Sequence, residues 1–178
     1  MRGSESRSLD LRAVWDLALP YQRFLAEATK NVGLWTDLYR IAHIPDWAIA
    51  QACDTGLGTR LLVIAEDWCG DASNTVPWLA KLADLAGCLE LRVIKRDEHP
   101  EVMDRYLTGG SRSIPIVIAL DADFEERGHW GPRPRELQEW VLAHRASIPS
   151  KERYAHARTW YAKDQGQTTL REVLELLK

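Results

Sequence analysis

The sequence predicts an α/β fold in which a central mixed sheet of about four strands is flanked by helices, with helical extensions at both ends. Two short apolar runs, at residues 60–66 and 89–95, enclose a helical pattern, which is typical of a βαβ unit with parallel strands. Two further strand-like runs, at 115–119 and 124–130, lie close enough to pair as a hairpin. Helical patterns occupy the first third of the chain and its end.

The first 58 residues are predicted to form an N-terminal helical extension. A helix is expected to begin near Pro20, because proline is favoured at the first helical position and apolar residues follow at helical spacing. Gly33 is expected to interrupt this pattern. Pro45 then predicts the start of a further helix, which is expected to end before Gly56.

Residues 59–146 are predicted to form the α/β core. The run from Arg60 to Glu66 is too short for a buried helix and has the length and apolarity of a buried strand. The helical stripe that follows is expected to end at Gly87. After the second strand, a charged helix over residues 100–107 is expected to lead into the hairpin.

Residues 147–178 are predicted to form C-terminal helices. The helical pattern that starts at Arg135 is broken at Pro149. Thr169 and Glu172 have the spacing of a capping box at the start of the last helix. The length of 178 residues suits one hydrophobic core, so a single domain is expected.

Composition and charge exclude several function classes. With 23 basic and 26 acidic residues the net charge is -3, so there is no excess of positive charge to neutralise phosphates and no nucleic-acid partner is expected. The longest apolar run, residues 114–120, is far shorter than the roughly 20 residues of a membrane-spanning helix, and the N-terminus lacks an apolar signal core. We therefore expect a cytoplasmic protein with no membrane partner.

The chain has three cysteines, Cys53, Cys69 and Cys88. Three are too few for a disulfide framework and lack the paired spacing of a zinc site, so reduced thiols are expected, with no metal and no cofactor. Cys53 and Cys88 each end a helix on an apolar stripe, which is typical of core residues.

Cys69 has a different setting, because it lies where the first core strand ends and its helix begins. Open α/β sheets place their ligands at this edge. The N–H groups and the positive dipole end of the helix favour a thiolate. Asp71 opposes it, since a carboxylate about 6 Å away costs a thiolate about 2 to 3 kcal/mol at an effective dielectric of about 20. The two effects nearly cancel, and an inert, half-buried cysteine is the alternative.

Four motifs along residues 59–146 resemble the thioredoxin family and occur in its order. They are Trp68-Cys69 at the strand-to-helix turn, Pro77 eight residues past the cysteine, Asp97 to Pro100 after the second strand, and Ser113-Ile114-Pro115 at the third strand. The resemblance implies a thioredoxin-like fold with Cys69 as the nucleophile. It also implies that Pro77 kinks the helix and that Pro115 is a cis-proline that orients substrates beside Cys69.

Ala72 stands where a dithiol thioredoxin has its second cysteine, so Cys69 cannot close a disulfide within its own helix. The segments WCGDA, LTGGSRSIP and WGPRP further resemble a bacterial branch of thioredoxin-like proteins with N-terminal helices. A mixed disulfide on Cys69 would need release by an external thiol or by a distant cysteine, Cys53 or Cys88.

These features predict monothiol thiol–disulfide exchange with a protein or a low-molecular-weight thiol or disulfide as the partner. The expected catalytic residues are Cys69, Asp71 as a modulator of the thiol, and Pro115; the expected substrate-binding residues are Trp68, Gly70, Arg112, Ile114 and Trp130. A wider basic set either converges in part near Cys69, where it could hold a carboxylate, or forms a solvated, ion-paired face. This set is Arg112, Arg127, His129, Arg133 and Arg135.

Three other functions stay open on the sequence. A protein without the second cysteine could be a non-catalytic module that binds an extended peptide or a partner protein. A peroxide sensor would oxidise Cys69 and then join it to Cys53 or Cys88. A cysteine hydrolase would need a histidine base, for which His99 and His129 are the candidates.

Overall fold

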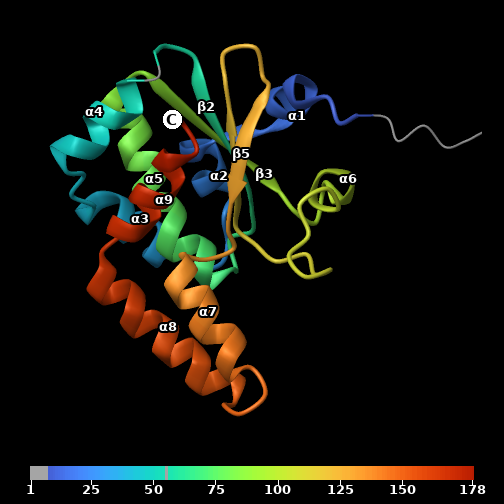
Figure 1. Cartoon of the computed structure of the whole chain (residues 1–178), viewed down its shortest axis with the longest axis vertical. Coiled ribbons are helices and arrows are strands. Elements are labelled where there is room, and N and C mark those ends of the chain that lie inside the picture. The colour runs from blue at the N-terminus through green and yellow to red at the C-terminus, as the bar shows by residue number, and fades with distance from the viewer. Residues whose placement is uncertain (1–7, 55) are drawn as a thin grey trace, which may run out of the picture.

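A computed structural model describes residues 8–54 and 56–178 (Figure 1). It confirms the predicted α/β class, with a mixed sheet flanked by helices. The elements in chain order are α1 (Leu11–Leu17), β1 (Leu19–Pro20), α2 (Tyr21–Glu27), α3 (Val32–Ile41), α4 (Asp46–Asp54), β2 (Thr59–Ala65), α5 (Gly70–Ala86), β3 (Leu89–Lys95), α6 (Pro100–Met103), β4 (Ile116–Leu120), β5 (Glu126–Trp130), α7 (Arg135–His144), α8 (Ser150–Asp164) and α9 (Gln167–Glu175).

The sheet has the strand order β1-β3-β2-β4-β5. β2 and β3 are parallel and joined by α5, as the apolar runs predict, whereas β4 is antiparallel to both β2 and β5. A fifth strand was not expected: β1 pairs antiparallel with β3 and places Leu19 opposite Val93. Two residues are too few to give the alternating pattern that predicts a strand.

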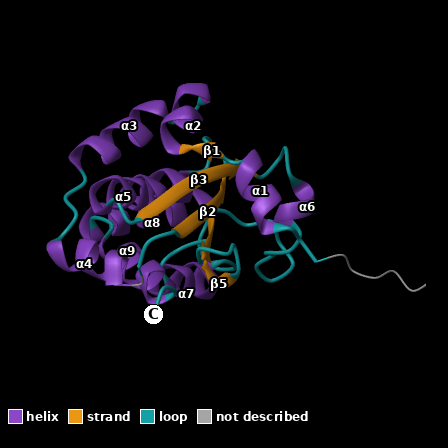
Figure 2. Ribbon diagram, turned by 90° about the horizontal axis from the view of Figure 1, so that it is seen from above, coloured by secondary structure: helices purple, strands orange, loops and turns teal. Residues whose placement is uncertain are grey.

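Helices cover both faces of the sheet. Figure 2 shows α1 and α6 on one side and α4, α5 and α9 on the other. One core joins the sheet to the N-terminal helices, since Trp15, Phe24 and Trp35 belong to the same buried cluster as the strands. Helices α7 and α8 form a smaller cluster of their own around Leu137 and Tyr161. No helix in the described part of the chain is both long and apolar enough to cross a membrane.

The helix break near the N-terminus differs from the one expected at Gly33. Gly33 lies inside α3, and the break falls before it, where Asn31 takes a left-handed conformation with φ 51. The cause is a tertiary contact, because the backbone N–H groups of Thr29 and Lys30 donate to the carboxylate of Asp67. N–H groups held in this way are not available for a continuous helix. The charged helix expected over residues 100–107 is also shorter, since α6 ends at Met103.

The expected capping box at Thr169 and Glu172 is wrong. Gly166 caps α9 with a left-handed φ of 72, and Thr169 lies within the helix with its hydroxyl buried. Glu172 instead accepts hydrogen bonds from the indole of Trp130 and the backbone of Arg135. A Cβ at residue 166 would overlap the ring of Trp78, so this cap must be glycine.

The expectation of reduced Cys53 and Cys88 is also wrong, because the two form a disulfide with a Cα–Cα distance of 5.5 Å. Helices α4 and α5 pack against each other, which brings together two cysteines that are 35 residues apart. Cys53 lies at the end of α4, and Cys88 follows α5 at the end opposite Cys69. Helix α5 has 17 residues and spans about 25 Å, so this pair does not resolve an oxidised Cys69.

We expect reduction of the Cys53–Cys88 bond to lower the free energy of unfolding by about 3 kcal/mol, because an unfolded chain without the cross-link has more conformational entropy. Chemical denaturation of the Cys53→Ser/Cys88→Ser double variant would measure the change. Cys69→Ser is the matched control, since it removes a cysteine and leaves the cross-link intact. Equal stability of the double variant and the control would contradict a structural role for the bond.

Candidate functional site

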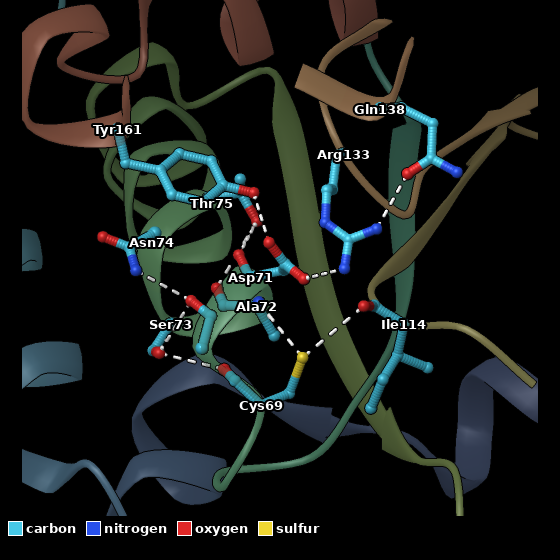
Figure 3. A network of polar contacts seen from close by, with 11 residues as sticks. Cys69, Asp71, Ala72, Ser73, Asn74, Thr75, Ile114, Arg133, Gln138 and Tyr161 are labelled. Carbon is cyan, nitrogen blue, oxygen red and sulfur yellow. Dashed lines mark hydrogen bonds and ion pairs between the residues drawn. The ribbon is translucent and has the colours of Figure 1, made fainter. Parts of the chain in front are cut away.

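Cys69 lies at the N-terminus of α5, directly after β2 and the loop that follows it. Its sulfur accepts a hydrogen bond from the backbone N–H of Ala72 at 3.4 Å, and its thiol donates to the carbonyl oxygen of Ile114 at 3.5 Å (Figure 3). The Ile114–Pro115 peptide bond is cis. The sulfur is therefore held between a helix N-terminus and the loop that leads into β4.

Burial dominates the ionisation of this thiol. Cys69 is only 8% exposed. Its pKa is raised to about 11, chiefly by burial, while the N–H of Ala72 lowers the pKa and the carboxylate of Asp71 raises it. The near-cancellation of the helix terminus and Asp71 that the sequence predicts is therefore wrong, because desolvation exceeds either effect. The hydrogen bond to the carbonyl of Ile114 requires the protonated thiol, so it also favours a raised pKa for Cys69.

Asp71 is held by two groups that the sequence did not link to it. One carboxylate oxygen forms an ion pair with the guanidinium of Arg133 at 2.7 Å, and the other accepts from the hydroxyl of Tyr161 at 2.8 Å (Figure 3). Arg133 also donates to the side chain of Gln138. This ion pair offsets part of the repulsion between Asp71 and a thiolate at Cys69, because Arg133 lowers the pKa of that thiol by less than Asp71 raises it.

The N-terminal helices are attached next to Cys69 through Asp67. Its carboxylate accepts from the backbone of Thr29 and Lys30, and its carbonyl oxygen accepts from the indole N–H of Trp35 at 2.9 Å. Trp35 is fully buried. The segment of residues 66–69 that leads into α5 is thus fixed by the N-terminal extension, and the first turn of α5 is fixed, through Asp71 and Tyr161, by α8.

A cavity of about 780 Å³ opens above the sulfur. Its walls come from residues 68–71 around Cys69, from residues 111–114 before Pro115, and from helices α3 and α8. Five predicted site residues line it together with Cys69: Trp68, Gly70, Asp71, Arg112 and Ile114. Pro115 adjoins it through Ile114. Trp130 lies elsewhere, buried and with its indole donating to Glu172.

Of the five basic residues that the sequence singles out, two line the cavity and three do not. Arg112 and Arg133 line the cavity, and Arg112 makes a bidentate pair with Asp104. Arg127 pairs with Asp121 at 3.7 Å, and Arg127, His129 and Arg135 do not line the cavity.

Neither candidate histidine supplies a base for Cys69. His99 contacts Glu101, and His129 contacts Glu126. The lining of the cavity contains no histidine in the described ranges 8–54 and 56–178, so the structure does not support the hydrolase alternative. The same ranges hold no group of three or more His, Cys, Asp or Glu side chains placed to bind a metal ion.

Two substitutions should move the reactivity of Cys69 in opposite directions. Asp71→Asn removes a negative charge and leaves Arg133 facing the sulfur, so alkylation at neutral pH should become about tenfold faster. Arg133→Gln leaves Asp71 without its cation, so alkylation should slow. Iodoacetamide modification followed by mass spectrometry measures both rates.

Arg135→Gln is a suitable control for this pair, because Arg135 lies outside the cavity and should leave the rate unchanged. A change of the same sign in Asp71→Asn and Arg133→Gln would mean that loosened packing, not charge, controls the thiol. Thermal unfolding of each variant separates the two causes.

Comparison with known proteins places the chain within a family. A protein-family model described as Thioredoxin matches residues 18–153. Two crystal structures have a similar fold: an HIV epitope scaffold (TM-score 0.74, 17% identity, 93% of this chain and 96% of that chain covered) and a protein of unknown function from Pseudomonas aeruginosa (TM-score 0.73, 19% identity, 92% and 94% covered). None of the curated proteins matches the chain.

Proposed function

Because the chain belongs to the thioredoxin family, we propose that it carries out monothiol thiol–disulfide exchange through Cys69. In the first step the Cys69 sulfur attacks a disulfide R–S–S–R′, forms Cys69–S–S–R and releases R′–S⁻, which takes up the proton lost by Cys69. In the second step an external thiol attacks the Cys69–S–S–R bond, releases Cys69 as a thiol and leaves with R as a new disulfide. We also propose that the single-cysteine motif WCGDA defines a bacterial branch of the family.

The observation that carries the proposal is the position of the Cys69 sulfur. It lies at the N-terminus of α5, accepts the N–H of Ala72 and faces a cavity of about 780 Å³. Cys69 is the one free cysteine among the described residues, and Ala72 follows it where a local resolving thiol would be. An external thiol must therefore complete the cycle.

Residues around the sulfur would share the remaining work. Asp71, Arg133 and Tyr161 form a network, buried at Tyr161 and half-buried at the ion pair, that sets the charge near the thiol. Trp68 is 47% exposed with the guanidinium of Arg96 4.8 Å from its ring centroid, so it can cover a bound substrate. Pro115 and Ile114 would place the substrate disulfide beside the sulfur, and Gly70 leaves room for its approach.

The raised pKa of the Cys69 thiol limits the rate of the proposed exchange at neutral pH. A thiol with a pKa of about 11 is almost wholly protonated at neutral pH, whereas the small thiolate fraction is more nucleophilic than that of an ordinary thiol. The exchange is therefore expected to be slow at pH 7 and faster in alkali. The mixed disulfide should in turn be long-lived, because a sulfur of high pKa is a poor leaving group.

Intact mass spectrometry tests the proposal. The protein is incubated with hydroxyethyl disulfide, and one adduct that maps to Cys69 and disappears on addition of 2-mercaptoethanol is expected. Cys69→Ser should form no adduct while keeping the Cys53–Cys88 bond. Absence of an adduct on the unmodified protein up to pH 9 would overturn the exchange function.

A non-catalytic binding module is the second candidate, and the high pKa and 8% exposure of Cys69 favour it. A partner that stays bound to Cys69→Ser would support this function, whereas a partner trapped only as a disulfide with Cys69 would support exchange. The peroxide sensor that joins Cys69 to Cys53 or Cys88 is not supported, because those two cysteines are bonded to each other.

We further propose the cytoplasm as the location, with its pool of small thiols as the second reactant. The Cys53–Cys88 bond opposes this proposal, since stable disulfides are rare in that compartment. Cell fractionation tests the location, and alkylation of thiols in intact cells before lysis preserves the redox state of Cys53 and Cys88 for the same samples. A protein that fractionates with the cytosol supports the proposed location, and one that fractionates elsewhere overturns it.

A further inference from the structure

We propose that the cavity above Cys69 selects small disulfides with anionic arms, such as dicarboxylates, over protein disulfides. The inference rests on the exchange function proposed above and adds the class of substrate. It is carried by the shape of the cavity, by the charge of its lining and by one arginine without a partner.

The shape favours a small molecule. A volume of about 780 Å³ falls within the range of about 300 to 1,000 Å³ that is common for small-molecule sites. Leu34 of α3 and Tyr154 and Tyr161 of α8 belong to its walls, and both helices lie outside the predicted core of residues 59–146. Cys69 is 8% exposed, so a disulfide must enter the cavity to reach the sulfur. A disulfide on a folded protein would have to bring its flanking chain between α3 and α8.

The charge of the lining favours an anion. Four arginines and a single acidic residue line the cavity: Arg96, Arg112, Arg133 and Arg158, with Asp71. The first three arginines are paired with Asp97, Asp104 and Asp71 respectively. The lining therefore has a positive excess, although the whole chain has a net charge of -3.

Arg158 is the arginine that a ligand would engage. It lies on α8, is exposed, and makes no ion pair or hydrogen bond with any residue in the described part of the chain. A guanidinium without a partner can hold a carboxylate through two parallel hydrogen bonds. The hydroxyls of Ser111 and Ser113 line the same cavity and make no hydrogen bond within residues 8–54 and 56–178, so they can donate to a second carboxylate.

Three small disulfides of similar size test this selection. Dithiodipropionate has two carboxylates, hydroxyethyl disulfide is neutral, and cystamine has two ammonium groups. The rate of adduct formation on Cys69 is measured for each disulfide. It is divided by the rate at which free 2-mercaptoethanol attacks the same disulfide, which removes intrinsic differences in reactivity. We expect dithiodipropionate to react about tenfold faster than cystamine, with the neutral compound between them. The preference should fall at 1 M salt, where the screening length is about 3 Å.

Arg158→Gln should reduce the preference for dithiodipropionate over cystamine about threefold, measured as the ratio of their normalised rates in the same variant so that any general change in exchange rate cancels. Lys163→Gln is the matched control, because Lys163 is an exposed cation on the same helix that does not line the cavity. It should keep the full preference. An equal loss in both variants would assign the effect to the overall charge of α8 and overturn the role of Arg158.

The inference and the exchange function fail in different ways. Equal normalised rates for the three disulfides, or a faster reaction with the disulfides of insulin than with dithiodipropionate, would overturn the inference and leave exchange intact. Titration of Cys69→Ser with dithiodipropionate, followed by the NMR signals of Ser113 and Arg158, measures selection without chemistry. Saturable shifts that are absent with cystamine would support the inference even if no adduct formed on the unmodified protein; no shifts would overturn it.

Discussion

Alkylation of Cys69 by iodoacetamide is expected to accelerate about tenfold for each pH unit between pH 7 and pH 10, about a thousandfold in total. The reason is that burial raises the pKa of the thiol to about 11, so the thiolate fraction continues to grow across this whole range. An ordinary cysteine with a pKa of about 8.5 gains only about thirtyfold, because it is almost fully ionised by pH 10.

The measurement is a series of timed reactions at fixed ionic strength, with the modified site identified by mass spectrometry and a short cysteine peptide as the reference. Circular dichroism at each pH confirms that the protein stays folded. A plateau of the Cys69 rate below about pH 9 would show that the sulfur is activated, and the helix terminus would then outweigh burial.

The same shift links the thiol to stability. A folded-state pKa above the unfolded value means that the folded protein holds its proton more tightly, so unfolding releases a proton at alkaline pH. The contribution of Cys69 to stability is therefore complete below about pH 8.5 and is lost as the pH rises towards about 11. Cys69→Ser should weaken this alkaline loss of stability and leave the acid side of the profile unchanged.

The parts of the fold that depend on local patterns could be predicted from the sequence. The apolar runs of β2 and β3 and the helix between them have clear periodicity, and they place Cys69 at the start of α5. The surroundings of the sulfur depend instead on distant contacts. Tyr161 reaches Asp71 across 90 residues, and no local pattern around either residue indicates that contact.

Two other features escaped sequence reasoning for the same reason. Cys53 and Cys88 pair because α4 packs against α5, and a count of cysteines does not predict the packing of two helices. Desolvation of Cys69 arises from the combined cover of several segments, among them the loop at Ile114. Sequence spacing gives an estimate of the repulsion between Asp71 and a thiolate at Cys69, but it gives no estimate of how deeply the sulfur is buried.

Gly131→Ala is expected to lower the free energy of unfolding by about 4 kcal/mol, from the sum of backbone strain and steric overlap. Gly131 follows β5 with a φ of 127, a conformation that L residues rarely adopt. A Cβ there would overlap the carbonyl oxygen of Pro115 and approach the Cα of Ile116 to 3.3 Å. Both are backbone atoms, so no side-chain rotation relieves the overlap.

Chemical denaturation measures this change, and Gly33→Ala is the matched control. Gly33 lies inside α3 with nothing within 4 Å of the position that a Cβ would occupy, so alanine there should be neutral or stabilise the protein by up to about 1 kcal/mol. Because the carbonyl oxygen of Pro115 must move in Gly131→Ala, the adjacent carbonyl of Ile114 should no longer cover the sulfur as closely. Cys69 should then react faster with iodoacetamide at pH 7. A stable Gly131→Ala variant with unchanged Cys69 reactivity would contradict the close contact between β5 and the loop before β4.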